Sequence, residues 1–162
     1  MGETIDRYKD KTVSQLKLIA VRHFHKYIRS RDQGKPCISC GSHTKLQAGH
    51  FYSAGHHPEL KFDEDNVHGQ CSRCNLFLSA NLIPYADNLR DKIGIKRYER
   101  LKLIVSLSKR SPFKWNRFFL IEIIEKYKAR SVHKNIRRIT KSRRISRQSF
   151  KISRSVLQWS YV

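Results

Sequence analysis

Apolar residues recur at helical spacing in the N-terminal part of the chain. Over about 13–30 they fall three or four residues apart, which is typical of one buried face of a helix. Thr12 and Gln15 form the Thr-x-x-Gln pattern of a capping box, so the helix is expected to begin directly after Thr12. The polar residues 31–36, which include a glycine and a proline, are expected to end it.

Two more helical patterns occupy the second half of the chain. Residues 89–108 carry one of them, which is interrupted near Gly94. Ser111 followed by Pro112 is a helix-start signal, a cap followed by proline at the first helical position. The apolar stripe over 118–127 predicts a helix face that packs either in the core or against a partner.

All four cysteines lie between these helical patterns, as two Cys-x-x-Cys pairs. The N-terminal residues lack the apolar stretch of a secretion signal, so the protein is expected to stay in the cytoplasm, where disulfides are disfavoured. Pairs with this spacing suit a tetrahedral zinc site built from two knuckles. We therefore predict one structural zinc ion, the alternative being four buried or redox-active thiols. The predicted zinc ligands are Cys37, Cys40, Cys71 and Cys74.

The chain is strongly basic. Its 162 residues include 34 Lys and Arg against 13 Asp and Glu, a formal net charge of +21. Twelve of the basic residues and none of the acidic ones lie within 126–162. This charge predicts a nucleic acid as partner, although a solvated arm would have the same composition. The mean hydropathy of −0.62, with no apolar run approaching about 20 residues, argues against a membrane protein.

These patterns together predict the α+β class, with a small zinc-ribbon core, flanking helices and a basic C-terminal extension. We expect the organisation to follow the chain in four parts. They are a helical segment (1–34), the zinc-containing core (35–84), a second helical region (85–130) and a basic tail (131–162) that contacts DNA.

A histidine and two asparagines lie around the second cysteine pair in the order found in HNH nucleases. His50 and Asn66 precede this pair, and Asn75 directly follows it. Residues 37–81 thus resemble the ββα-metal (HNH-like) class, in which a zinc ribbon holds a hairpin and a helix together. The resemblance implies that His50 lies on the hairpin, that Asn66 fixes the loop, and that Asn75 lies on the helix and helps to hold a catalytic metal.

The detailed motif resembles one branch of that class. Cys-x-x-Cys-Gly occurs at 37–41, Ala-Gly-His-Phe at 48–51, and Asn-x-His-x-Gln-Cys-x-x-Cys-Asn-x-Phe-Leu-Ser-x-Asn at 66–81. This string is similar to that of the phage lambda NinG/Rap family of recombination endonucleases. The resemblance implies a structure-specific endonuclease that cuts Holliday junctions, D-loops and other branched DNA, leaving 5′-phosphate and 3′-hydroxyl ends.

The residue types suit metal-assisted phosphodiester hydrolysis. A histidine, whose ordinary pKa is about 6.5, can accept the proton of an attacking water near neutral pH, and His50 is expected in that role. A divalent ion, Mg²⁺ or Mn²⁺, would stabilise the charge that develops on the phosphate. The carbonyl oxygen of Asn75 suits such a hard cation, although Asn75 could merely cap a helix. Asn66 is expected to orient the hairpin through hydrogen bonds.

One position departs from the HNH pattern. Many HNH nucleases place an aspartate metal ligand directly before the first histidine, and here that residue is Gly49. The second catalytic ligand is then expected from His68, Asp65 or Asp63, of which His68 belongs to the motif string. His50 could instead be a ligand itself, with another group as the base.

Contacts with DNA are expected to rest on phosphate charge, because nothing resembles a helix that reads the major groove. His56 and His57 are either ordinary loop residues or part of the groove that holds the DNA. Because a four-way junction has near two-fold symmetry, a homodimer is a further hypothesis, with the 118–127 stripe or the N-terminal helix as its interface. The candidate phosphate-binding residues are Arg73, Lys96, Arg97, Lys109, Arg110, Arg137, Arg138, Arg143 and Arg144.

Two other functions stay open at this point. The first is a zinc-ribbon DNA-binding protein without catalysis, such as an accessory or regulatory factor, and Gly49 is its main support. The second is an RNA-binding or ribosome-associated factor, which the charge alone would allow. Competition between branched DNA and structured RNA would distinguish it.

Overall fold

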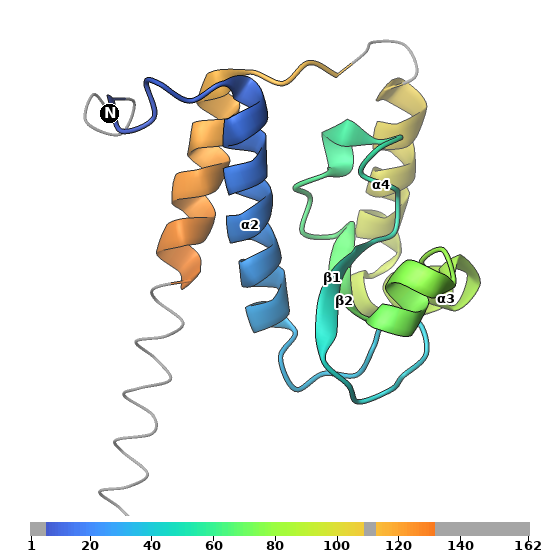
Figure 1. Ribbon diagram of the computed structural model, residues 1–162. Helices are drawn as coiled ribbons and strands as arrows, with labels where there is room; N and C mark the ends of the chain where they lie inside the picture. The colour runs from blue at the N-terminus through green and yellow to red at the C-terminus, as the bar shows by residue number, and fades with distance from the viewer. Residues whose placement is uncertain (1–5, 109–112, 132–162) are drawn as a thin grey trace, which may run out of the picture.

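The computed structural model describes residues 6–108 and 113–131 of the chain. Helix α2 (Val13–Arg31) lies side by side with a helix over residues 117–131, and a two-stranded hairpin lies on the other side of α2 (Figure 1). Helices α3 (Leu82–Ile93) and α4 (Ile95–Ser108) lie beyond the hairpin. The expected α+β class is confirmed at this level.

Helix α2 begins where the capping box predicts. The Thr12 Oγ1 accepts a hydrogen bond from the Gln15 amide (3.2 Å), and the Gln15 Oε1 accepts one from the Thr12 amide (2.9 Å). Two backbone donors that the helix itself leaves unpaired are thereby satisfied. The buried face of α2 consists of residues at i, i+4 spacing: Leu16, Ala20, Phe24 and Ile28.

The hairpin consists of β1 (Leu46–His50) and β2 (Val67–Cys71), which pair antiparallel so that His50 lies opposite Val67. A single turn of 3₁₀ helix, η1 (Pro58–Leu60), lies in their connection. Ala48 and Val67 pack into the cluster that α2 forms, so the helical flank and the cysteine-bearing region share one core.

A second cluster lies between the hairpin connection and helices α3 and α4. It contains Leu60, Tyr85 and Leu101, all fully buried. Gly94, with φ of +79°, separates the two helices, which confirms the predicted interruption. Helix α3 begins at Leu82, ahead of the start that the periodicity predicts. Where a helix was expected to follow the second cysteine pair, the chain forms a short π-helix, η2 (Arg73–Phe77).

The last described helix packs its apolar stripe against α2. The stripe is therefore core within this chain, and Phe118 is its one member with most of its surface (66%) exposed. The predicted start at Ser111 and Pro112 lies outside the described residues. Residues 113–116 are irregular, and the Asn116 Oδ1 accepts the Phe119 amide hydrogen (2.8 Å) at the start of the described helix. The buried residues are Leu120, Ile121, Ile123, Ile124 and Tyr127.

Among the described residues, no helix combines the length and the apolar character needed to cross a membrane. The predicted basic tail falls almost wholly on residues 132–162, which lie outside the described part of the chain.

Candidate functional site

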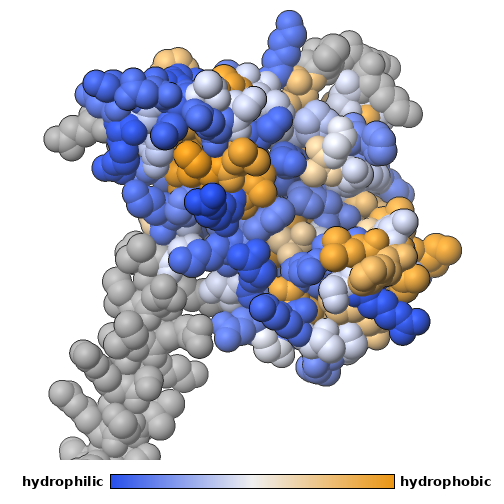
Figure 2. Space-filling view, viewed as in Figure 1, coloured by the Kyte–Doolittle hydropathy of each residue, from blue (hydrophilic) through white to orange (hydrophobic). Residues whose placement is uncertain are grey.

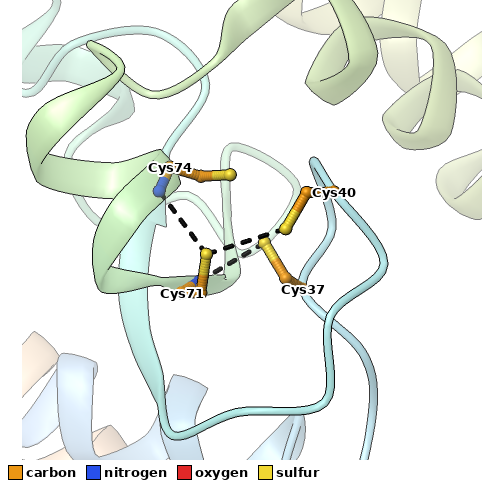
Figure 3. Close-up of side chains that lie close together, drawn as sticks. All are labelled: Cys37, Cys40, Cys71 and Cys74. Atoms are coloured by element: carbon orange, nitrogen blue, oxygen red, sulfur yellow. Dashed lines mark hydrogen bonds between the residues drawn. The ribbon is translucent and has the colours of Figure 1, made fainter.

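The four cysteines come together at the base of the hairpin. Cys37 and Cys40 come from the loop before β1, and Cys71 and Cys74 from the end of β2 and from η2 (Figure 3). Their sulfur atoms all lie within 4.8 Å of one another. The Cys40 and Cys71 sulfurs are 3.7 Å apart, and tetrahedral zinc with Zn–S bonds of ~2.3 Å places its sulfurs about 3.8 Å apart. The predicted cluster is confirmed, and its donor set fits zinc.

Hydrogen bonds to the sulfurs support the same interpretation. The Cys71 amide donates to the Cys37 Sγ (3.3 Å), and the Cys74 amide donates to the Cys71 Sγ (3.4 Å).

The thiols of the cluster differ in how readily they ionise. The hydrogen bond with the Ser42 hydroxyl lowers the pKa of Cys40 to about 6, whereas burial raises the pKa of Cys74 to about 12. Because zinc binds thiolates, its charge would offset the cost of ionising a buried thiol such as Cys74.

A cavity of about 520 Å³ lies at the end of β1, and it brings two of the predicted catalytic residues together. His50 reaches it as the last residue of β1, and Asn75 reaches it from η2. The described residues around this cavity include no Asp or Glu, so its polar surface is made of neutral and histidine side chains. The other lining residues include Tyr52, His56, His57, Ser79 and Leu82.

His50 is fixed in one orientation and in its neutral form. Its Nε2 lies 3.1 Å from the Lys61 carbonyl oxygen, which can only accept, so Nε2 carries the hydrogen and Nδ1 keeps its lone pair. Burial lowers the pKa of His50, and the bond to Lys61 offsets this only in part. The His25 ring from α2 lies against it, with ring centroids 5.7 Å apart. Burial, and then the proximity of His50, lowers the pKa of His25 to about 4.

Asn75 is oriented by a neighbour on β1. Its Nδ2 donates to the Gln47 Oε1 (2.7 Å), which turns that end of the amide toward the strand and leaves Oδ1 as the possible metal ligand. Asn75 lies inside η2, whose N-cap is Ser72, so the capping alternative is wrong.

Asn66 holds the loop that follows His50, as expected. It is fully buried, and its Oδ1 accepts from the Tyr52 amide (2.8 Å). Its Nδ2 donates to the carbonyl oxygens of Tyr52 (3.0 Å) and Leu60 (3.1 Å). Asn66 is therefore a positioning residue and lies away from the cavity surface.

His68, the leading candidate for a second catalytic ligand, does not join His50 and Asn75. Its Nδ1 accepts from the Arg31 guanidinium (3.0 Å), and its Nε2 donates to the Asp65 carbonyl (3.1 Å). Both ring nitrogens are thus occupied, and the side chain is 3% exposed. The expected ligand role finds no support, because neither nitrogen has a lone pair available for a metal.

The acidic candidates for that ligand are also engaged elsewhere. The Asp65 carboxylate accepts from Arg97 (2.9 Å) and from Arg100 (3.2 Å), and Asp63 accepts from Arg100 (2.7 Å). None of the residues proposed in place of the missing aspartate lines the cavity.

His68 belongs to a buried network at the end of α2. Asp32, which is 1% exposed, accepts from the Arg31 guanidinium (2.7 Å) and from the Gly69 amide (2.9 Å). Burial acts to raise the pKa of Asp32, but the Arg31 guanidinium outweighs it and holds that pKa well below the usual value. Burial, then the charges of Lys92 and Arg31, lowers the pKa of His68 to about 3.

The His68 pKa predicts that acid weakens the fold. Because its pKa in the folded state is lowered, its contribution is complete above about pH 6.5 and is lost as the pH falls toward 3. In that window each pH unit removes about 1.4 kcal/mol of unfolding free energy. His68→Gln should make the slope shallower by about one proton in urea unfolding of zinc-loaded protein, between pH 5 and 6. The exposed His43, changed to Gln, is the control; equal slopes for both variants would contradict the assignment.

The packing around Gly49 leaves no room for an aspartate side chain before His50. A Cβ at this position would lie within 2.9 Å of the Gln70 Cβ and closer still to the Gln70 Oε1, which is buried and has no hydrogen-bond partner among the described residues. Gln70 instead uses its Nε2 to bind Ser39 Oγ (2.7 Å). The space of a side chain at 49 is therefore filled from β2.

This packing gives a second prediction. Gly49→Ala should lower the unfolding free energy by about 1–3 kcal/mol, because the added carbon forces Gln70 out of place. At Gly55, a Cβ would contact only the Ser53 Oγ among the described residues, at 3.7 Å. Gly55→Ala should therefore change the unfolding free energy by less than about 0.5 kcal/mol. Thermal unfolding of the two variants side by side checks this. Equal stability would show that Gln70 moves freely.

Only three of the predicted phosphate-binding residues lie in the described part of the chain. Arg73 on η2 and Lys96 on α4 are exposed. Arg97 is also exposed, but its ion pair with Asp65 reduces its value for binding phosphate. The remaining candidates lie outside the described residues: Lys109, Arg110, Arg137, Arg138, Arg143 and Arg144.

Sequence reasoning missed several supporting residues. Gln47 orients Asn75, Lys61 supplies the carbonyl for His50, and His25 packs on the His50 ring. His25 directly follows a buried position of α2, which is a weak signal, whereas the contacts of Gln47 and Lys61 depend on the tertiary fold.

The fold and the site define a class: a small α+β protein with a four-cysteine cluster that could hold a metal ion, beside a cavity lined by histidine and asparagine. A family model described as Bacteriophage Lambda NinG protein matches residues 4–142, and the chain belongs to that family. The membership in the NinG family that the motif string indicates is thus confirmed.

Curated relatives match the chain over part of its length. Protein ninG of Salmonella phage P22 is 45% identical over 78 residues, which are 47% of this chain and 38% of that protein. Protein ninG of Escherichia phage lambda is 42% identical over 78 residues, again 47% of this chain and 38% of that protein. The match therefore spans well under half of these relatives. No solved structure matches the chain significantly.

Proposed function

We propose that this protein is a metal-dependent endonuclease that hydrolyses phosphodiester bonds in branched DNA. His50 is the general base, and Asn75 is the protein ligand of a Mg²⁺ or Mn²⁺ ion. The observation that carries the proposal is that these two side chains line one cavity, each turned by a hydrogen bond on its far side. We infer a bacteriophage enzyme that acts in the cytoplasm of the infected bacterium.

His50 suits the removal of a proton from water. Because burial lowers its pKa, the ring is neutral at pH 7 and Nδ1 is ready to accept. Once Nδ1 is protonated, the bond from Nε2–H to the Lys61 carbonyl helps to stabilise the charged ring. The base is therefore held in the correct tautomer by the fold before DNA binds.

Asn75 offers the neutral oxygen that a hard cation accepts. Mg²⁺ is commonly held by few protein oxygens, with water and substrate phosphate completing its shell. When bound, it would stabilise the charge on the phosphate and on the leaving oxygen. With no carboxylate among the described lining residues, we expect metal binding to depend on the DNA phosphate.

Zinc has a separate, structural role in this proposal. Cys74 and Asn75 are adjacent on η2, and Cys71 ends β2, the strand that pairs with the His50-bearing β1. The cysteine cluster therefore fixes η2 against the hairpin that carries His50. The net charge of +21 and the exposed Arg73 favour binding to a polyanion. A homodimer on two-fold symmetric junctions stays a hypothesis, which size exclusion with and without junction DNA tests.

The test is cleavage of a labelled four-way junction and of a linear duplex of the same strands. The zinc-loaded protein is dialysed free of other metals and assayed in Mg²⁺, in Mn²⁺, in Ca²⁺ or with no added metal. Dialysis is used in place of a strong chelator, because a chelator would also remove zinc. We expect cutting in Mg²⁺, faster on the junction, and unaffected by excess structured RNA. Binding without cutting in Mg²⁺ or Mn²⁺ would contradict the proposal.

A second candidate is a DNA-binding accessory protein without catalysis. The observation that favours it is Gly49, where Gln70 excludes any carboxylate side chain. On this alternative the junction is bound tightly in a salt-sensitive manner and stays intact in every metal, and His50→Ala leaves its affinity unchanged.

A further inference from the structure

Five apolar side chains are exposed together in the segment that follows the second cysteine pair. Ile83 (83%) and Phe77 (79%) have the largest exposed fractions of the large apolar residues in the described part of the chain. Figure 2 shows hydrophobic surface gathered over the region of α3, at the right of the view. We term this set the apolar edge; it consists of Leu76, Phe77, Leu78, Leu82 and Ile83.

The backbone of the apolar edge is held in an unusual conformation. The π-helix η2 is followed by three residues other than glycine with positive φ, Ser79 (45°), Ala80 (71°) and Asn81 (46°). Such conformations persist only where the surrounding structure enforces them. Here Ser39 Oγ donates to the Ala80 carbonyl (3.2 Å), and the Asn81 amide side chain donates to the Cys74 Sγ (3.5 Å). The fold thus holds the apolar side chains in solvent.

The apolar edge is continuous with the cavity. Leu82 belongs to both, and Asn75, the proposed metal ligand, directly precedes Leu76. Any occupant of the edge therefore lies beside the His50 cavity. A second copy of the chain bound at the edge would block access of the substrate to the cavity. A DNA substrate, in contrast, could occupy the edge and the cavity together.

The segment that carries the apolar edge contains no acidic side chain of its own, the first one after it being Asp87. Residues 73–86 contain no Asp or Glu, and they begin with the exposed Arg73. A phosphate backbone beside this segment meets one cation and no repelling carboxylate within it. Apolar patches on a soluble monomer mark an interaction site when they are this concentrated.

We propose that the apolar edge binds nucleobases whose stacking is interrupted, at a branch or a bulge, while the adjoining phosphate enters the cavity. This rests on the proposed function, because it takes nucleic acid as the ligand. Phe, Leu and Ile side chains insert at base steps of bent DNA, and aromatic side chains stack on free base faces. In a continuous duplex those faces are covered, so the edge selects DNA with a disrupted stack.

The test is binding rather than cleavage. Anisotropy titrations in Ca²⁺ compare a duplex carrying a short unpaired bulge with the fully paired duplex. Wild-type protein should prefer the bulged duplex on the order of 10-fold. Phe77→Ala should reduce that preference to about twofold or less while its affinity for the paired duplex is kept, and Phe77→Trp should retain it. Leu18→Ala, which removes another exposed apolar side chain (67%) from α2, is the matched control.

The outcomes separate this inference from the proposed function. A preference that depends on Phe77, in a protein that does not cut in Mg²⁺, supports the apolar edge and rejects the hydrolase. Cutting without any effect of Phe77→Ala on the preference, or with equal weakening on both duplexes, overturns the apolar edge alone. A third outcome is that the protein forms a dimer, that Phe77→Ala dissociates this dimer, and that the preference for the bulged duplex is unchanged. The edge would then be an interface between copies of the chain, and the inference would be overturned.

Discussion

Replacing His50 by alanine should lower the rate of DNA cleavage by about 10²–10⁴-fold, the range that a positioned general base contributes. The variant loses the Nδ1 lone pair that the Lys61 carbonyl leaves free, while the residues that bind DNA stay in place. Single-turnover cleavage of a labelled junction in Mg²⁺ measures the loss. The affinity for the same junction, measured in Ca²⁺, should change by less than about threefold, since His50 carries no charge at pH 7.

A neighbouring histidine provides the control for this loss. His56 lines the same cavity but is exposed and lies on the loop after β1. His56→Ala should reduce cleavage by less than about tenfold, because no hydrogen bond from the described residues fixes His56 as the base. If both variants lose activity equally, the cavity is important but His50 has no special role. If His50→Ala cuts as fast as the wild type, the assignment of the base is wrong.

Loss of zinc should remove the fold of residues 37–81. Structural zinc contributes on the order of 10 kcal/mol in small zinc-binding domains, and Cys74 joins the cluster to η2 and, through the Asn81 amide, to the start of α3. Cys74→Ser should therefore contain close to no zinc by elemental analysis. It should also lose its cooperative unfolding transition.

Ser72→Ala is the matched control for the zinc site. Ser72 lies between the two cysteines of the second pair and is exposed, so its replacement should leave both zinc content and unfolding unchanged. A wild-type protein that is folded and contains no zinc would contradict the structural role of the cluster. So would a Cys74→Ser variant that unfolds at the wild-type temperature.

Local sequence signals predicted the parts of the fold that depend on neighbours along the chain. The Thr12–Gln15 capping box is satisfied within one turn, and the interruption at Gly94 needs only a residue that tolerates positive φ. The cysteine cluster was predictable because the two-residue spacing already places both sulfurs of a pair on one side of a turn. Hydrophobic periodicity likewise gave the buried face of α2.

Features that depend on distant residues were not predictable. His68 was expected near His50, but the network that holds it comes from Arg31 and Asp32 at the end of α2. The cap that Asn116 provides at the start of the last described helix was likewise not predicted from the sequence.

The candidate site shows the same division. The motif string named His50, Asn66 and Asn75, and the structure brings His50 and Asn75 to one cavity. The Lys61 carbonyl orients His50, and the Gln47 amide oxygen orients Asn75. Both contacts depend on the register of the hairpin and on its connection, which the sequence pattern did not predict. The expected aspartate is missing for a packing reason that only the contact with Gln70 shows.

The pH dependence of single-turnover cleavage by the wild-type protein tests the central claim most directly. The zinc content is measured at each pH, and only fully loaded samples are compared. Because burial lowers the His50 pKa below 6.5, the rate in Mg²⁺ should be constant from about pH 6.5 to 8 and fall tenfold per unit below that lowered pKa. A rate that keeps rising tenfold per unit up to pH 8, or no cleavage at any pH, would contradict a neutral His50 base.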